Sequence, residues 1–196
     1  MKKFIVFEGI DGSGKSTQSK FLANYLNGAY TFEPTDNKIG KLIREVLEGK
    51  EKFSKETLAL LFAGDRIEHN KEIINLLNSS YVICDRYVYS SLAYQLTQGI
   101  NLNYIMEINK FAKIPDVVIY LLVSVENALN RMDNRTNKEI FEKKEFLTKL
   151  INNYNLIIEK ELFRPKLGYI IIDTNNKSIE EVNNEIIKKL EEKEII

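Results

Sequence analysis

The stretch FIVFEGIDGSGKSTQ, residues 4–18, passes from an apolar run into glycines and closes on a lysine, two hydroxyl side chains and a glutamine. Its second half satisfies the pattern G-x-x-x-x-G-K-[ST] from Gly9 to Ser16, between a predicted strand and a predicted helix. Glycine lets the backbone curl so that successive N–H groups point inward, and the start of a helix adds its positive end. We therefore predict a loop that binds the phosphates of a nucleoside triphosphate, made of Gly9, Gly12, Ser13, Gly14, Lys15, Ser16 and Thr17.

Two side chains of this loop carry most of the expected chemistry. Lys15 would neutralise the β- and γ-phosphate oxygens, and the Ser16 hydroxyl would ligate the Mg²⁺ that bridges them. The alternative is a glycine-rich turn without a ligand, with Lys15 on the surface. The full spacing and the flanking elements favour the phosphate-binding loop.

The composition favours a single soluble globular domain, residues 1–196. Hydrophobic residues make up 44% of the chain, and no apolar run approaches the roughly 20 residues of a membrane span. The 28 Lys and Arg residues balance the 28 Asp and Glu residues, so there is no overall positive charge for nucleic-acid binding. A single cysteine, Cys84, excludes an internal disulfide, and the start MKKFIVFEG lacks the apolar region of a signal peptide. We expect a cytoplasmic protein that binds neither nucleic acid nor membrane.

Short apolar runs alternate with longer amphipathic ones. The predicted strands are 4–7, 29–32, 81–84, 117–123 and 169–172, and the predicted helices are 15–26, 39–47, 55–77, 87–98, 104–111, 125–132, 139–161 and 178–192. Apolar strands without strict alternation suit a parallel sheet covered on both faces. We predict a three-layer α/β fold of the P-loop NTPase type, with a five-stranded parallel sheet flanked by helices. A polar stretch interrupts two helices and predicts a short lid at about 132–140.

The segment LLFAGDRIEH, residues 60–69, places Phe62 and Arg66 four residues apart, so on a helix they share a face. An aromatic ring beside a guanidinium can hold a flat base and donate to its exocyclic oxygen. Alternatively, Phe62 belongs to an apolar core stripe and Arg66 pairs with a neighbouring acid. His69, the sole histidine, has no metal-ligating neighbour at suitable spacing, and we interpret it as a surface or packing residue.

The segment DRYVYSSLAYQ, residues 85–95, follows a predicted strand. Asp85 should therefore emerge at the carboxyl edge of the sheet, where the phosphate loop also opens, and face the Mg²⁺. Ser90 and Tyr94 share a face of the helix that follows. The alternative for Asp85 and Arg86 is a surface ion pair or a helix cap.

The chain resembles the thymidylate kinases, which transfer phosphate from ATP to dTMP, in the order and spacing of FEGIDGSGKSTQ, LLFAGDRIEH, DRYVYSSLAYQ, PDVVIYLLVSVENALNR and NRTNKEIFEKKEFLTKLINNY. The resemblance implies that Phe62 stacks on thymine and that Arg66 bonds its O4 edge. It also implies that Arg86 contacts the acceptor phosphate and bridges it to the donor, that Ser90 reaches the base edge and that Tyr94 closes the site around the sugar. Members are usually homodimers, so a homodimer is expected here.

Two further roles follow from the resemblance. The resemblance implies that Asp11 contacts the 3′-hydroxyl of the acceptor sugar or positions the metal. The alternative is that Asp11 only stabilises the turn. The loop lacks the arginine that some members carry, so a lid arginine, Arg131 or Arg135, would supply positive charge in the transition state. Arg135 is the first choice because it lies within the polar stretch. The alternative is two arginines on a solvated helix end.

The chain also departs from the family. Many members have arginine where Phe32 precedes Glu33-Pro34, so a contact is absent or comes from Arg44. Leu122 stands where the family often has aspartate, which leaves fewer acidic groups near the metal. Residues 173–175 correspond to the adenine-holding loop, whose contacts are largely backbone.

Three hypotheses for the activity remain. The leading one is transfer from ATP-Mg²⁺ to dTMP without a general base, because the acceptor phosphate is already anionic. A kinase of another nucleotide or of a deoxynucleoside is the second; Glu33, which we place in the substrate site, would be the base for a deoxynucleoside. An ATP-driven switch is the third, since no N-K-x-D motif supports a GTP-driven one.

Overall fold

The computed structural model describes residues 2–132 and 137–196. The strands are β1 (Phe4–Glu8), β2 (Ala29–Phe32), β3 (Val82–Asp85), β4 (Val117–Leu122) and β5 (Tyr169–Asp173). The helices are α1 (Lys15–Tyr25), α2 (Lys38–Leu47), α3 (Lys55–Leu76), α4 (Val88–Thr97), α5 (Leu102–Ile108), α6 (Val125–Arg131), α7 (Asn137–Glu159) and α8 (Ile179–Glu192). Every predicted strand and helix has a counterpart here.

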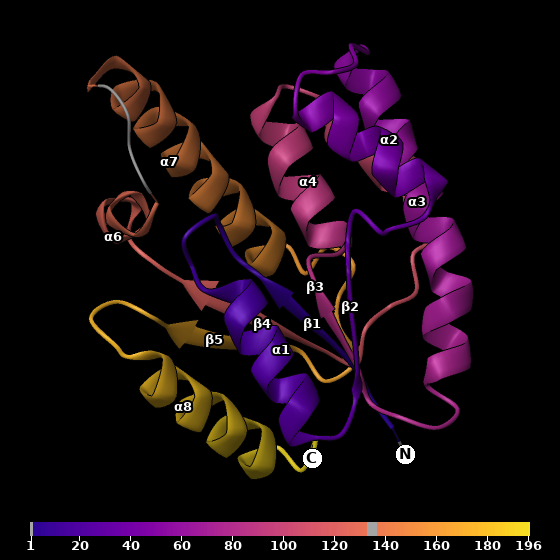
Figure 1. The fold of residues 1–196 in the computed structure, drawn as a ribbon, viewed down its shortest axis with the longest axis vertical. Coiled ribbons are helices and arrows are strands. Elements are labelled where there is room, and N and C mark those ends of the chain that lie inside the picture. The colour runs from indigo at the N-terminus through magenta and orange to yellow at the C-terminus, as the bar shows by residue number, and fades with distance from the viewer. Residues whose placement is uncertain (1, 133–136) are drawn as a thin grey trace.

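The five strands form one parallel sheet in the order β2-β3-β1-β4-β5. The strand that precedes the phosphate loop is therefore central, paired with β3 on one side and β4 on the other. Helices α1 and α8 lie on one side of the sheet and α3, α4 and α7 on the other (Figure 1). The predicted α/β fold with a five-stranded parallel sheet is confirmed.

Alternate side chains of β1 enter the two cores. Phe4 and Val6 pack with residues of α3, α4, α5 and α7. Ile5 and Phe7 pack with residues of α1 and α8. All four side chains have no solvent exposure, which explains why this strand reads as a continuous apolar run. The three predicted layers follow from these two cores.

The predicted helix 104–111 was wrong at both ends, because α5 spans Leu102–Ile108. Asn101 begins the helix by accepting hydrogen bonds from the backbone N–H groups of Asn103 and Tyr104. At the other end Asn109 donates its side-chain amide to the Ile105 carbonyl. The predicted lid at 132–140 overlaps residues 133–136, which include Arg135 and lie outside the described residues.

Helix α3 leaves a row of apolar side chains in solvent. Leu60, Ile67 and Ile74 are 51%, 39% and 54% exposed and lie seven residues apart, so they share one helical face that we call the α3 stripe. In the described parts of the chain, no helix combines the length and the apolar content needed to cross a bilayer.

Candidate functional site

Two cavities lie at the ends of β1 and β3. The loop cavity, about 520 Å³, is lined by residues 11–18, Arg86, Arg131, Thr174, Lys177, Ser178, Ile179 and Val182. The α3–α4 cavity, about 330 Å³, is lined by Asp11, Glu33, Pro34, Leu47, Leu58, Ala59, Phe62, Arg66, Arg86, Tyr87, Ser90, Ser91, Tyr94, Gln95 and Gln98. Asp11 and Arg86 line both, so the two cavities meet at this pair.

The glycines of the loop are required by their surroundings. Gly12 has φ +80°, and a Cβ there would lie 2.7 Å from the Ala128 carbonyl oxygen. Gly9 has φ +147°, and its Cβ would lie 2.7 Å from the Leu121 carbonyl oxygen. A larger residue at either position would be strained and would clash with backbone. The loop is thus held against β4 and α6, with the start of α1 beneath it.

Lys15 is buried at the base of the loop. It is 5% exposed, and its Nζ donates a 2.7 Å hydrogen bond to the Ile10 carbonyl. Burial lowers the pKa of Lys15 to about 7, and the Arg86 charge adds to this effect, while Asp11 and Asp85 oppose it. A bound polyphosphate would restore the charged form of this side chain.

Ser16 and Asp85 fit a hard cation. The Ser16 hydroxyl donates to Asp85 Oδ2, and Oδ1 of the same carboxylate is buried without a partner among the described residues. Hydroxyl and carboxylate oxygens are the ligand types that Mg²⁺ takes, usually together with phosphates and water. Among the side chains that the structure describes, those of residues 2–132 and 143–196, no group of three or more His, Cys, Asp or Glu that could hold a metal occurs. A cation on Ser16 and Asp85 would take its remaining ligands from phosphate oxygens and water.

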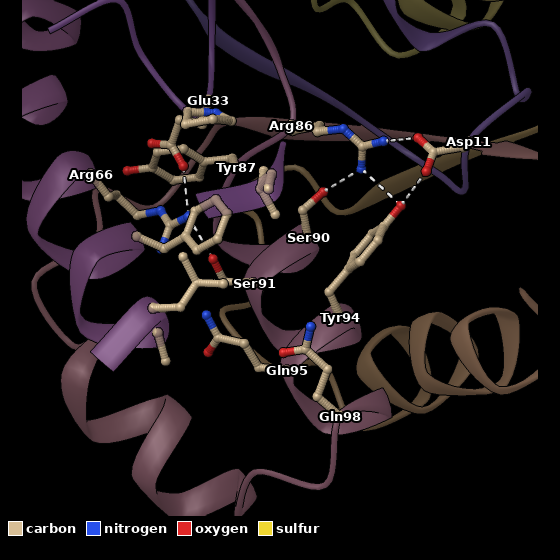
Figure 2. Close-up of a pocket in the computed structure, with 15 residues that line it drawn as sticks. Asp11, Glu33, Arg66, Arg86, Tyr87, Ser90, Ser91, Tyr94, Gln95 and Gln98 are labelled. Carbon is tan, nitrogen blue, oxygen red and sulfur yellow. Dashed lines mark hydrogen bonds and ion pairs between the residues drawn. The ribbon is translucent and has the colours of Figure 1, made fainter. Parts of the chain in front are cut away.

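Arg86 lines both cavities, and its contacts in the α3–α4 cavity are drawn in Figure 2. Its backbone has φ +66°, and its N–H donates to the Phe7 carbonyl at 3.0 Å. Its guanidinium pairs with Asp11 and donates to Ser90 Oγ at 3.3 Å and to the Tyr94 hydroxyl at 3.4 Å. The Tyr94 hydroxyl donates in turn to Asp11 at 3.0 Å. Burial is the largest single effect and raises the pKa of Asp11, but the charges of Arg86 and Lys15 and the hydrogen bond from Tyr94 together outweigh it, so the pKa is lowered.

Arg66 lies at the other end of the α3–α4 cavity (Figure 2). It is 1% exposed, and Nη2 donates to Glu33 at 2.6 Å and to Ser91 Oγ at 2.9 Å. Nη1 donates to Asn109 Oδ1. His69 Nδ1 lies 3.1 Å from the Glu33 carboxylate, so the histidine is a buried packing residue rather than a surface one. These contacts fix the guanidinium at the cavity wall.

The face of α4 toward Arg66 carries polar groups that the sequence analysis did not single out. Ser91 and Gln95 share it, one turn apart, and both line the cavity. The Gln95 side-chain nitrogen and oxygen are buried and have no partner among the described residues. A Ser and a Gln four residues apart, and so on one face of the helix, are the signal that could have found them. Ser90 faces the Arg86 side instead, because its hydroxyl donates to Glu8 at 2.7 Å.

Two more arginines were expected near the phosphates. Arg131 donates to the Gly12 carbonyl at 3.1 Å and to the Thr174 carbonyl at 2.6 Å, so it lies over the loop. Arg44 donates to the Pro34 carbonyl and to Asp36, each at 2.7 Å. It is not among the residues that line either cavity.

The comparisons with known proteins agree on one family. The family model described as thymidylate kinase matches residues 7–186. A protein named "Probable thymidylate kinase" from Methanococcus aeolicus is 63% identical over 196 residues, which is 100% of both chains. A protein of the same name from Methanocaldococcus jannaschii is 51% identical over 184 residues, covering 94% of this chain and 93% of the other.

Solved structures give the same result. A thymidylate kinase structure from Candida albicans superposes with a TM-score of 0.82 at 29% identity, covering 98% of this chain and 92% of the other. One from Ehrlichia chaffeensis superposes with a TM-score of 0.75 at 30% identity, covering 97% of this chain and 98% of the other.

Proposed function

Because the chain belongs to the thymidylate kinase family and phosphorylates dTMP to dTDP, we propose that its two cavities divide the reaction between donor and acceptor. In this proposal ATP occupies the loop cavity and dTMP occupies the α3–α4 cavity. The observation that carries it is that Asp11 and Arg86 line both cavities, so the two phosphate ends would meet there. Residues 1–196 would then act as a single catalytic domain.

The thymine base would lie between the apolar wall and the Arg66 end of the α3–α4 cavity. Phe62 would stack on it, and Arg66, which only donates hydrogen bonds, would select a carbonyl oxygen at position 4. Ser91 and Gln95 supplement the predicted set, because an amide without a partner offers one donor and one acceptor to the imide edge of thymine. Glu33 would act on this substrate by holding Arg66 in place, a role that its 2.6 Å contact supports.

The sugar and phosphate would lie toward Arg86. Tyr94 would pack against the sugar, and Asp11 would contact its 3′-hydroxyl after exchanging part of its contact with Arg86. Arg86 would bind the acceptor phosphate and Ser90 would support it from α4. The base-edge role that the resemblance assigns to Ser90 is thereby proposed for Ser91 instead.

Transfer itself would depend on placed charge. An oxygen of the dTMP phosphate forms a bond to the terminal phosphorus of the donor while the bond to the β-phosphate oxygen breaks. Lys15 and Arg131 would neutralise the phosphate oxygens, together with Arg135, which lies outside the described residues. No general base is needed, because the acceptor is already anionic at neutral pH.

Members of this family generally use Mg²⁺ with ATP. We propose that Ser16 and Asp85 hold the ion, on the grounds of their mutual contact and the free Asp85 oxygen. Bound there, Mg²⁺ would offset charge on the β- and γ-phosphates. Asp85 would thus act as the acidic ligand that Leu122 does not provide.

We also propose a cytoplasmic homodimer with no nucleic-acid or membrane partner. The α3 stripe supports the dimer, since three exposed apolar side chains on one face gain by burial against a second copy. The equal numbers of acidic and basic residues argue against a nucleic-acid partner.

Acceptor competition tests the assignment of the second cavity. ADP release is measured with ATP-Mg²⁺ and dTMP, dUMP, dCMP, UMP or water, for the wild type and for Arg66→Met. The wild type should prefer dTMP, and the variant should lose most of its preference for dTMP over dCMP. Unchanged discrimination in the variant would remove Arg66 from the base site.

A further inference from the structure

The Glu8 carboxylate joins three elements beneath the two cavities. Glu8 ends β1 and is 1% exposed. Its Oε1 accepts hydrogen bonds from the backbone N–H groups of Tyr87 at 2.8 Å and Ser90 at 3.0 Å. Its Oε2 accepts from Ser90 Oγ at 2.7 Å and from the Tyr154 hydroxyl at 2.9 Å. We call Glu8, Ser90 and Tyr154 the Glu8 junction.

The junction fixes the start of α4. The N-cap residue, Tyr87, makes no side-chain capping bond, and the backbone N–H of Ser90 makes a 3.1 Å contact with the Tyr87 carbonyl. Glu8 supplies a carboxylate acceptor for the N–H groups of Tyr87 and Ser90 from another element, and its negative charge suits the positive end of the helix. Arg86 directly precedes this cap, and its own N–H is bound to Phe7. Hydrogen bonds to β1 from the N–H of Arg86 and from the N–H of Tyr87 therefore fix the position of Arg86 relative to this strand.

Tyr154 brings α7 to the same point. Its hydroxyl lies 3.1 Å from Ser90 Oγ and 3.4 Å from the carbonyl oxygen of Gly9, the first glycine of the loop. The ring is 1% exposed and packs on Tyr120, with ring centroids 5.2 Å apart. One hydroxyl thus contacts the beginning of the phosphate loop and the helix that follows Arg86.

We propose that Glu8 and Tyr154 are positioning residues that hold Arg86 in register with the phosphate loop, so that the acceptor and donor phosphates are aligned for transfer. The inference rests on the role proposed above for Arg86. Neither Glu8 nor Tyr154 lines the loop cavity or the α3–α4 cavity, so in this proposal neither touches the substrates. The junction consequently affects the distance and angle between two bound groups, on which transfer depends steeply.

Tyr154→Phe tests this directly, because it keeps the ring and removes only the hydroxyl. We expect kcat to fall about tenfold, while KM for ATP and for dTMP each change less than about twofold, since misplacement costs rate rather than binding. Glu8→Gln, which keeps the shape and removes the charge, should lower kcat in the same way. Both variants are compared with wild type by ADP release at saturating Mg²⁺.

Tyr89→Phe is the matched control. Tyr89 is also 1% exposed and lies on α4, but its hydroxyl donates to the Phe163 carbonyl at 2.6 Å, away from both cavities. Tyr89→Phe should lower the melting temperature as much as Tyr154→Phe does, while its kcat stays at the wild-type value. Equal kcat losses in Tyr89→Phe and Tyr154→Phe would overturn the proposal by making the effect one of general packing.

Arg86→Ala separates this inference from the proposed function. If Arg86→Ala abolishes turnover but Tyr154→Phe and Glu8→Gln keep the wild-type kcat, the positioning inference fails alone. If Arg86→Ala itself keeps full turnover, the role of Arg86 fails and the inference falls with it. A rise in either KM at unchanged kcat in Tyr154→Phe would also overturn the alignment argument.

Discussion

Replacing Glu33 with alanine should destabilise the protein by about 3–5 kcal/mol, because it breaks a buried ion pair and leaves one charge behind. The side chains of Arg66 and Glu33 are only 2% and 3% exposed, and their atoms lie 2.6 Å apart. Without the carboxylate, the acceptors left to the Arg66 guanidinium in the described part of the chain are the neutral oxygens of Ser91 and Asn109. His69 also loses a contact, at a cost of about 1 kcal/mol.

The size of the expected melting shift follows from the length of the chain. A domain of 150–250 residues loses about 2–4 °C per kcal/mol, so the predicted loss corresponds to roughly 6–20 °C. Glu48→Ala is the control, because Glu48 and its partner Lys50 have side chains 53% and 69% exposed. Because solvent screens that exposed pair, its loss should change the melting temperature little.

Thermal unfolding followed by circular dichroism and urea unfolding give the two independent readings. Glu33→Ala combined with Arg66→Met should recover part of the loss, because no charge is then left without a counter-ion. The reasoning is refuted if Glu33→Ala melts within about 2 °C of Glu48→Ala. It is also refuted if the double variant is less stable than Glu33→Ala, since the cost would then come from lost packing.

The pKa of Lys15, lowered to about 7, predicts that kcat/KM for ATP falls as pH rises through that value, because the neutral amine no longer attracts phosphate. Lys15→Arg should show no such fall, and equal pH profiles would contradict the assignment. Gln95→Leu should raise KM for dTMP by about tenfold without lowering the melting temperature, because the amide has no partner among the described residues to lose; a large drop in melting temperature would make Gln95 structural. Ile67→Glu should shift a dimer toward monomer in sedimentation velocity at unchanged melting of the monomer, and an unchanged sedimentation coefficient would remove the α3 stripe from the interface.

The phosphate loop could be predicted because its information is local. Glycines whose neighbours exclude a Cβ, a lysine and a hydroxyl all fall within one turn between a buried strand and a helix. The pairing of Phe62 with Arg66 on one face was predictable for the same reason, since four residues of helix fix their direction.

The partners of Arg66 could not be predicted, because Glu33 and Asn109 come from distant parts of the chain and meet it only in the folded core. The two serines of α4 show a second limit of prediction from the sequence. Helical spacing puts Ser90 and Ser91 on neighbouring faces, but only the rotation of α4 against β1 and α3 decides which of them meets Arg66. The spacing of residues along a helix predicts which side chains share a face, whereas the packing of the helix decides which neighbours that face contacts.

The central place of β1 has a consequence for the order of folding. Phe4 pairs with Val82 and Ile5 with Val117, so the strand that enters the phosphate loop gains its neighbours only after much of the chain has been synthesised. Such distant pairings slow folding, because a long stretch of chain must be ordered before they form. A nucleotide that needs the finished loop therefore binds late and stabilises the whole sheet by mass action. In the cell, the supply of substrate would act on the yield of folded enzyme as well as on its turnover.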